Sequence, residues 1–255
     1  MQEDDYPNLR ELKRRGTPIG VPRLMSNKVS ISCQLAVSVP IFYSKTEPVN
    51  GKLPLTFIPN AGQVHEDVLY YMQRSGRVFY FTREQSVFTF MEASSKQRKR
   101  FKVKPQEREK REAESPIRGI TLALQFIGAN PHVQVEGQHE AIGKVNYFIG
   151  NDPTKWVTDL STYHEVIYKE LWPGIDLLFT GKNGGLKYEF IVKPGANIED
   201  IRLRYRGAEH LSLDEEGNLE IHTRYGILLE ERPISIQEIE GQQVPVTSSF
   251  LLQKD

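Results

Sequence analysis

The sequence predicts an all-β protein, built as a multi-stranded antiparallel sandwich or as barrel-like sheets with very little helix. Short runs in which apolar and polar residues alternate recur along most of the chain, which is typical of strands with one buried face. Turn residues separate these runs at short intervals and favour antiparallel connections. No stretch repeats apolar residues with the 3.6-residue period of an amphipathic helix.

The same alternation predicts each strand, taken here in chain order. The first is residues 29–39, and a meander follows at residues 68–72, 77–82 and 86–91. Further strands are predicted at residues 121–126, 132–136, 163–171, 175–180 and 186–192. The last group is residues 201–206, 211–214, 218–222, 227–229, 234–239 and 244–252. Short helices are expected only at residues 60–67 and 197–201.

Two strands have the strictest alternation, and they predict the centre of the core. Successive side chains on a strand point to opposite faces, so every second residue shares a face. We expect the apolar face of each to be buried: Leu186, Tyr188, Phe190 and Val192 in one, and Ile201, Leu203 and Tyr205 in the other. The opposite face of the second strand carries Arg202, Arg204 and Arg206 and is expected to face solvent.

Composition excludes several classes of function. The 255 residues contain 33 Lys and Arg and 33 Asp and Glu, so the net charge is zero and no global field favours nucleic acid. A single cysteine excludes an internal disulfide framework and a multi-cysteine metal cage. The sequence has no phosphate-binding loop, nucleophile elbow or dinucleotide fingerprint. We therefore predict no catalytic residues, no metal and no cofactor.

The chain divides by composition into two parts. Residues 1–52 are predicted to form an N-terminal arm and the first strand, and residues 53–255 the β-rich domain. That domain is expected to have sub-lobes at residues 53–127 and 128–255, with a charged loop at residues 92–116. The acidic start is followed by no apolar segment, so no conventional signal peptide is predicted. The apolar stretch at residues 31–43 is too short to span a bilayer.

Two sets of residues are candidates for binding a ligand. Trp156 and Trp172 would offer a stacking platform for sugar rings, against the alternative that both are buried at corners of the core. The arginines at 202, 204 and 206 would grip phosphates or uronates, against the alternative that they face acidic residues such as Glu220 on a neighbouring strand.

One pair of carboxylates offers an enzymatic alternative. Asp176 and Glu189 lie on neighbouring predicted strands, and two carboxylates about 5–10 Å apart are the machinery of a glycosidase. The opposing interpretation is that Asp176 caps the turn after Pro173 and that Glu189 lies on a solvated face. We expect the second interpretation, and hence a protein that is not an enzyme.

Several passages resemble the uncharacterised β-rich domain that precedes SBBP-type β-propeller repeats in bacterial surface and secreted proteins. The resemblance covers about residues 53–252. Its most specific passages are Asn146-Tyr-Phe-Ile-Gly-Asn-Asp-Pro-Thr-Lys-Trp156 and Pro173-Gly-Ile-Asp176; others are Asn60-Ala-Gly-Gln63 and Phe81-Thr-Arg-Glu84.

The resemblance implies a function that composition alone does not. It implies a non-catalytic structural or interaction domain, a cell-surface or secreted location, and as partner a C-terminal β-propeller, another surface protein or a cell-surface glycan. The sequence lacks a clear signal peptide, so a cytoplasmic location stays open beside the one that the resemblance implies. The alternatives are a glycan-binding module that uses the tryptophans and a carbohydrate-active enzyme that uses Asp176 and Glu189. We expect no nucleic-acid partner and no membrane span.

Overall fold

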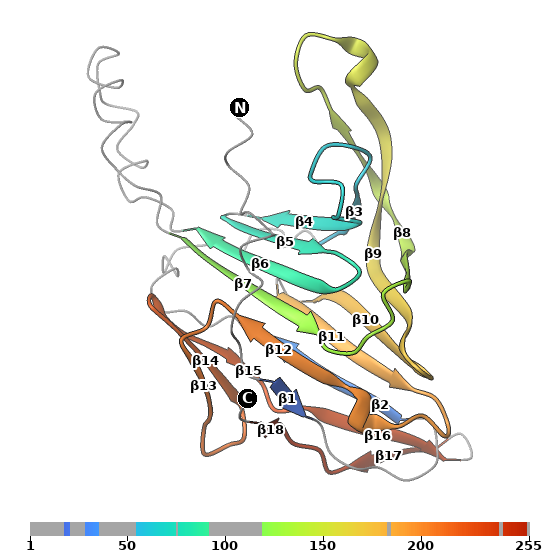
Figure 1. Cartoon of the computed structure of the whole chain (residues 1–255). Helices are drawn as coiled ribbons and strands as arrows, with labels where there is room; N and C mark the ends of the chain where they lie inside the picture. The colour runs from blue at the N-terminus through green and yellow to red at the C-terminus, as the bar shows by residue number, and fades with distance from the viewer. Residues whose placement is uncertain are drawn as a thin grey trace.

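Two antiparallel sheets pack face to face, with a small third sheet against one end (Figure 1). The structure is a computed structural model that describes residues 18–20, 29–35, 55–74, 76–91, 119–182, 185–239 and 242–253. These residues form 18 strands and two single-turn 3₁₀ helices, η5 (Pro153–Lys155) and η6 (Ile198–Asp200). The predicted all-β class is therefore confirmed. Within the described ranges, no helix has the length and apolarity needed to cross a membrane.

Sheet A has eight strands in the order β18-β1-β12-β7-β6-β5-β4-β3. The bounds of its strands are β1 Pro18–Gly20, β3 Ile58–Pro59, β4 Tyr70–Arg74, β5 Arg77–Phe81, β6 Gln85–Met91, β7 Gly119–Phe126, β12 Arg202–Arg206 and β18 Leu251–Leu252. The strands from β4 to β6 follow chain order because short turns join antiparallel neighbours, and β7 pairs with β6 as the next strand of the sheet.

Sheet B has seven strands in the order β17-β16-β2-β11-β10-β9-β8, and sheet C has three in the order β13-β14-β15. The bounds in sheet B are β2 Val29–Leu35, β8 Gln134–Tyr147, β9 Val157–Trp172, β10 Ile175–Lys182, β11 Gly185–Val192, β16 Ile234–Ile239 and β17 Gln242–Val246. Those in sheet C are β13 His210–Leu213, β14 Leu219–Thr223 and β15 Gly226–Glu230. Sheets A and B each contain strands from before and after residue 127, the predicted boundary between the two sub-lobes.

The structure corrects several predicted boundaries. Residues 60–67 form bends and a turn rather than a helix, whereas η6 confirms the helix expected near residue 197. The short strands expected at residues 132–136 and 163–171 are pieces of β8 and β9, which are 14 and 16 residues long. The outer parts of these two strands were not predicted, because both of their faces are largely exposed and their sequences do not alternate. The charged loop at residues 92–116, and all of residues 1–52 except β1 and β2, lie outside the described residues.

The core between sheets A and B is aromatic, and it confirms the predicted faces. The seven side chains expected to be buried in β11, β12 and the residue before β12 are all at most 4% exposed. Phe81 of sheet A meets Phe179 of sheet B with ring centroids 5.0 Å apart, and Phe126 meets Tyr168 at 5.5 Å. Edge-to-face ring pairs of this kind add to the free energy gained by burying the rings.

Strand β9 joins the two sheets directly. It pairs with β10 in sheet B, and Tyr163 also forms an antiparallel bridge with Phe57, which precedes β3 of sheet A. The backbone N–H of Phe57 donates to the carbonyl of Tyr163 at 2.7 Å, and the reverse bond is 2.9 Å. Further along β9, the buried Tyr168 hydroxyl donates to the carbonyl of Thr82 at 2.8 Å. The sandwich is thus closed along this side by hydrogen bonds as well as by packing.

Phe190→Ala is expected to lower the free energy of unfolding by about 3–5 kcal/mol, because Phe190 is 1% exposed and its removal leaves a cavity beside Trp172 and Tyr188. Arg202→Ala, at an exposed position of β12, is the matched control and should change it by less than about 0.5 kcal/mol. Chemical denaturation followed by fluorescence measures both. A near-neutral Phe190→Ala would mean that the two sheets do not pack through this face.

Candidate functional site

The β8–β9 hairpin, residues 134–172, begins within sheet B, and its outer part projects beyond the stacked sheets, where Figure 1 shows its end standing clear of the rest of the fold. We call residues 134–172 the projecting hairpin and residues 148–156 its tip. The pairing of β9 with β10 ends at Glu165, and its bridge to Phe57 lies at Tyr163. Among the described residues, the part of the hairpin beyond Tyr163 pairs with no third strand. A two-stranded ribbon gains little stability alone, so its outer part depends on local contacts.

Two β-bulges shape the outer part of the hairpin. Between the pairs Glu140–Tyr163 and Lys144–Ser161, β8 has two residues more than β9, and Ile142 there is fully exposed. The buried Thr162 hydroxyl donates to the carbonyl of Gly143 at 3.0 Å and holds this bulge in place. Bulges re-aim side chains and prevent an exposed edge from pairing with another strand.

The second bulge lies on β9, nearer the tip. Asp159 has a positive φ of 57°, which is unusual for a residue other than glycine. Its backbone N–H donates to the Asn146 side chain at 2.7 Å across the hairpin. His139 and Glu170 are the other positive-φ residues of this kind among the described positions, and both also lie in the projecting hairpin. Backbone strain is therefore concentrated in this element, as is common at functional sites.

The tip presents apolar side chains on a well-defined scaffold. Phe148, Ile149 and Trp156 are 62%, 54% and 38% exposed. Phe148 and Trp156 pack edge to face with centroids 5.2 Å apart, and the indole N–H of Trp156 donates to the carbonyl of Gly150 at 3.2 Å. The tip is therefore a shaped aromatic surface rather than a lone exposed ring.

A capped helical turn supports this aromatic pair. Asp152 precedes η5 and accepts hydrogen bonds from the backbone N–H and the hydroxyl of Thr154, at 3.0 and 2.7 Å. These bonds lower the pKa of Asp152, so the carboxylate is ionised at neutral pH. Lys155 carries the opposite charge on the same turn. The charges of Asp152 and Lys155 balance, so the tip has no net charge.

Two tyrosines of β4 fix the hairpin to sheet A. The Tyr70 hydroxyl accepts from the backbone N–H of Gly137 at 2.8 Å, and its ring packs edge to face on Tyr163. A side chain at Gly137 would collide with the Tyr163 ring, whose nearest atom lies 2.4 Å from the place of a Cβ. Nearer the tip, the hydroxyl of the buried Tyr71 donates to the Tyr147 hydroxyl. The tip is thus presented from an anchored base.

The two tryptophans predicted as a joint platform are far apart. Trp172 is 1% exposed and donates from its indole N–H to the carbonyl of Ile127 at 3.0 Å, so the alternative of a buried corner residue is right for Trp172. It is wrong for Trp156, which is 38% exposed at the tip. The two rings lie at opposite ends of the 16-residue strand β9, which spans about 50 Å.

The arginine ladder of β12 is not one open face. Arg202 is exposed and Arg204 half-buried, but Arg206 is 8% exposed, which corrects the prediction that it faces solvent. Its Nε donates to the amide oxygen of Gln125 on β7 at 2.6 Å. The expected partner Glu220 is also wrong, because the neighbours of β12 are β1 and β7 while Glu220 lies on β14 of sheet C.

Asp176 and Glu189 share a face of sheet B but have separate partners. Asp176 pairs in register with Ile191 and Glu189 with Leu178, so the two are diagonal neighbours about 7–8 Å apart along the sheet. The Asp176 carboxylate accepts from the backbone N–H of Glu170 at 2.7 Å and from Lys193 at 3.3 Å. Glu189 pairs with Lys187 at 3.1 Å. Asp176 therefore stabilises the bulge of β9 beside the Pro173-Gly174 turn.

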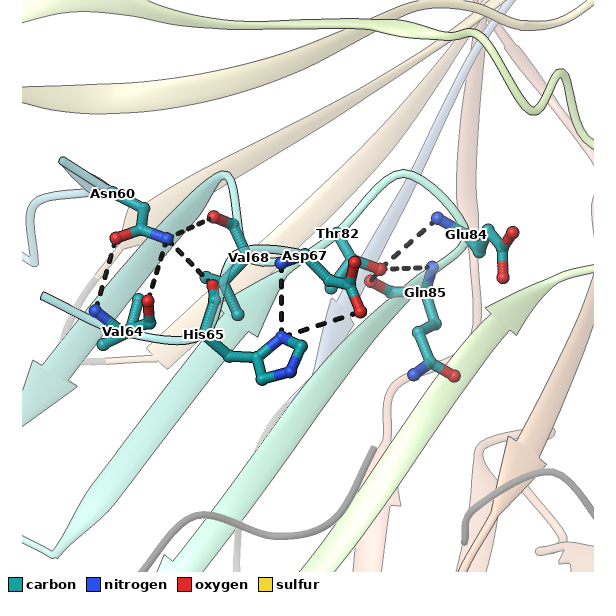
Figure 2. Close-up of polar contacts among 8 residues, drawn as sticks. All are labelled: Asn60, Val64, His65, Asp67, Val68, Thr82, Glu84 and Gln85. Carbon is teal, nitrogen blue, oxygen red and sulfur yellow. Dashed lines mark hydrogen bonds and ion pairs between the residues drawn. The ribbon is translucent and has the colours of Figure 1, made fainter. Parts of the chain in front are cut away.

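The loops that carry the shorter family-like passages lie side by side where β4 begins and β5 ends (Figure 2). The Asn60 side chain donates to the carbonyls of Val64, His65 and Val68 and accepts from the backbone of Gly62. In the adjacent turn the Thr82 hydroxyl donates to the carbonyl of Gln85 at 3.0 Å. These polar groups satisfy the loops' own backbone, which explains the passages by local folding.

Sequence reasoning missed one polar cluster, on the outer face of sheet C. The Ser212 hydroxyl donates to Glu220 at 2.7 Å and lies 2.7 Å from Nε2 of His222, and Glu220 lies 3.2 Å from the same nitrogen. A catalytic serine relay needs the acid on the other ring nitrogen, so this cluster lacks that geometry. Within the described ranges, no three His, Cys, Asp or Glu side chains are grouped to hold a metal.

The fold and site define an all-β sandwich domain with a projecting hairpin that ends in an exposed aromatic tip. The chain belongs to a family described as a domain of unknown function, DUF7948, whose model matches residues 57–255. The match includes the whole projecting hairpin and all of sheet C. No curated protein and no solved structure matches the chain.

Acrylamide quenching of tryptophan fluorescence is expected to distinguish the two indoles, because Trp156 is 38% exposed and Trp172 only 1%. Trp156→Phe should remove the strongly quenched component and leave a protected, blue-shifted spectrum from Trp172. Equal quenching in the wild type and in Trp156→Phe would contradict the exposed position of Trp156 at the tip.

Proposed function

We propose that this domain is a non-catalytic interaction module and that the hairpin tip is the surface that contacts its partner. The observation that carries the proposal is the pair Phe148 and Trp156, held edge to face on a capped turn and exposed at the end of an anchored hairpin. Exposed aromatic side chains grouped in this way mark interaction sites, and tryptophan is enriched among residues that dominate binding energy.

The chemistry of the tip favours a protein partner with an apolar pocket. Phe148, Ile149 and Trp156 offer apolar area, and the charges of Asp152 and Lys155 balance. The two bulges of the hairpin oppose strand addition along its edges. Contact through side chains at the tip therefore suits this element better than pairing through its backbone.

The resemblance to domains that precede SBBP-type repeats supports a biological setting for this contact. We propose that the domain acts at a bacterial cell surface or in a secreted protein, and that its partner is a β-propeller of the same polypeptide or another surface protein. No nucleic-acid partner is proposed, because the chain has no net charge.

Photo-crosslinking from the tip tests the protein partner. With p-benzoylphenylalanine in place of Phe148, irradiation of cells that make the protein is expected to give one dominant protein adduct. The same group in place of Ile227, an exposed residue of sheet C, is the matched control and should not give that adduct. Trp156→Ser in the same chain should reduce the adduct. Crosslinking of equal yield from both positions, or none from position 148, would contradict the proposal.

The second candidate is a glycan-binding module, which the exposed ring of Trp156 favours on its own. A glycan array probed with the wild type and with Trp156→Ala distinguishes it: binding by the wild type that the variant loses would support a sugar ligand at the tip.

The enzymatic alternative predicts glycan hydrolysis that disappears in Asp176→Asn or Glu189→Gln. We expect no hydrolysis, because the Asp176 carboxylate is engaged by the backbone of Glu170 and by Lys193.

A further inference from the structure

A carboxyl group is fully buried where the three sheets meet. Glu230, the last residue of β15 in sheet C, is 0% exposed. One of its oxygens accepts from the hydroxyl of Tyr188, on β11 of sheet B. The other accepts from the hydroxyl of Tyr205, on β12 of sheet A, at 2.7 Å. One side chain therefore connects all three sheets.

Glu230 is the polar member of an otherwise aliphatic docking face. Its register partner on β14 is Leu219, and Ile221 and Leu228 form the next pair on the same face of the sheet. These three side chains are at most 2% exposed and belong to the main core. The fully buried part of this docking face thus consists of three aliphatic side chains and one carboxyl, and the partly buried Leu211 of β13 packs beside Ile221.

Among the described residues, no Lys, Arg or His side chain forms an ion pair with the carboxyl, and its hydrogen-bond donors Tyr188 and Tyr205 are neutral phenols. On β12, Arg204 and Arg206 alternate with Tyr205 and so lie on the opposite face of the strand. On β14, Glu220 and His222 lie on the outer face of sheet C, bonded to Ser212. On β11, Lys187 and Glu189 pair with each other on the outer face of sheet B.

Strand β2 also packs against β15, and its sequence VSISCQL contains no Asp, Glu, Lys, Arg or His. Its one titratable residue is Cys33, the register partner of Tyr188. A buried carboxylate whose hydrogen bonds come from neutral phenols carries a large desolvation penalty. The protonated acid avoids this penalty, and its O–H can donate to the oxygen of one of the two phenols, which then accepts instead of donating.

We propose that Glu230 is a pH-sensitive latch: its neutral carboxyl holds sheet C against the sandwich, and ionisation of the carboxyl loosens sheet C. The inference is independent of the function proposed for the hairpin tip. Loosening would expose the aliphatic docking face of Leu219, Ile221 and Leu228, because these side chains are buried in the main core when sheet C is docked.

The direction of the pH effect follows from where the proton is held. Burial raises the pKa of Glu230 from 4.5 to about 7, and the hydrogen bonds from Tyr188 and Tyr205 offset part of the rise. Between about pH 4.5 and pH 7, Glu230 keeps its proton when sheet C is docked and has lost it when sheet C is open. Docking is therefore strongest below about pH 4.5, weakens as the pH rises to about 7, and is level above that.

Hydrogen exchange of the wild-type protein, corrected for the intrinsic pH dependence of exchange, is the principal test. Between about pH 5 and pH 8.5, protection of the amides in β13–β15 should fall on the order of 70-fold relative to that of β5 and β6 in sheet A. Glu230→Gln keeps a neutral polar group in place and should abolish the fall. Glu220→Gln, a half-exposed carboxyl of the same sheet, is the matched control and should retain it.

An infrared titration keeps the proposal falsifiable if Glu230→Gln does not fold. Exposed carboxyl groups are ionised at about pH 6, so a carboxylic-acid carbonyl band that persists there and disappears by about pH 8 would report Glu230. Tyr205→Phe removes a donor to the charged form and should move that loss to higher pH. Absence of the band at pH 6, an unchanged fall in Glu230→Gln, or an equal fall in all sheets would overturn the proposal.

Discussion

Strand β9 is the constraint on which the rest of the structure depends. It hydrogen-bonds to β10 within sheet B and bridges to Phe57 at the edge of sheet A. Its inward side chains Tyr168 and Trp172 fill the space between the sheets and bond to backbone carbonyls of sheet A or its connections. The same strand then leaves the sandwich and forms half of the projecting hairpin. The packing of the core, the closure of the sandwich and the position of the candidate site therefore all depend on one continuous strand.

The sequence predicts those strands of the fold that have one buried face and one face exposed to solvent. In β11 and β12 the alternation identifies the buried residues correctly, because Phe190 and Leu203 face a dry core while their neighbours do not. The outer halves of β8 and β9 have no such contrast, and their ends were not predictable from alternation. The burial of Arg206 was not predicted for a related reason: the side chain that contacts it, Gln125, lies on a strand that is distant in the sequence.

The candidate site was only half visible in the sequence. Trp156 was singled out, but with Trp172 as its companion, because sequence does not reveal that β9 separates the two rings by its whole length. Its real companion is Phe148, eight residues earlier, which the reversal of the hairpin at η5 brings into contact. Glu230 likewise reads as one more charged residue at a strand end. Its burial depends on Tyr188 and Tyr205, which come from two other sheets.

The continuity of β9 has a mechanical consequence. A partner that pulls on the tip along the hairpin axis loads the hydrogen bonds between β9 and β10 parallel to the strands, so that these bonds share the force instead of opening one at a time. Tyr70 and Tyr71 brace the hairpin from the side, on a different sheet. The hairpin is thus built as a tether whose attachment runs the length of the core, and tension applied at its aromatic end passes directly into the most deeply buried part of the protein.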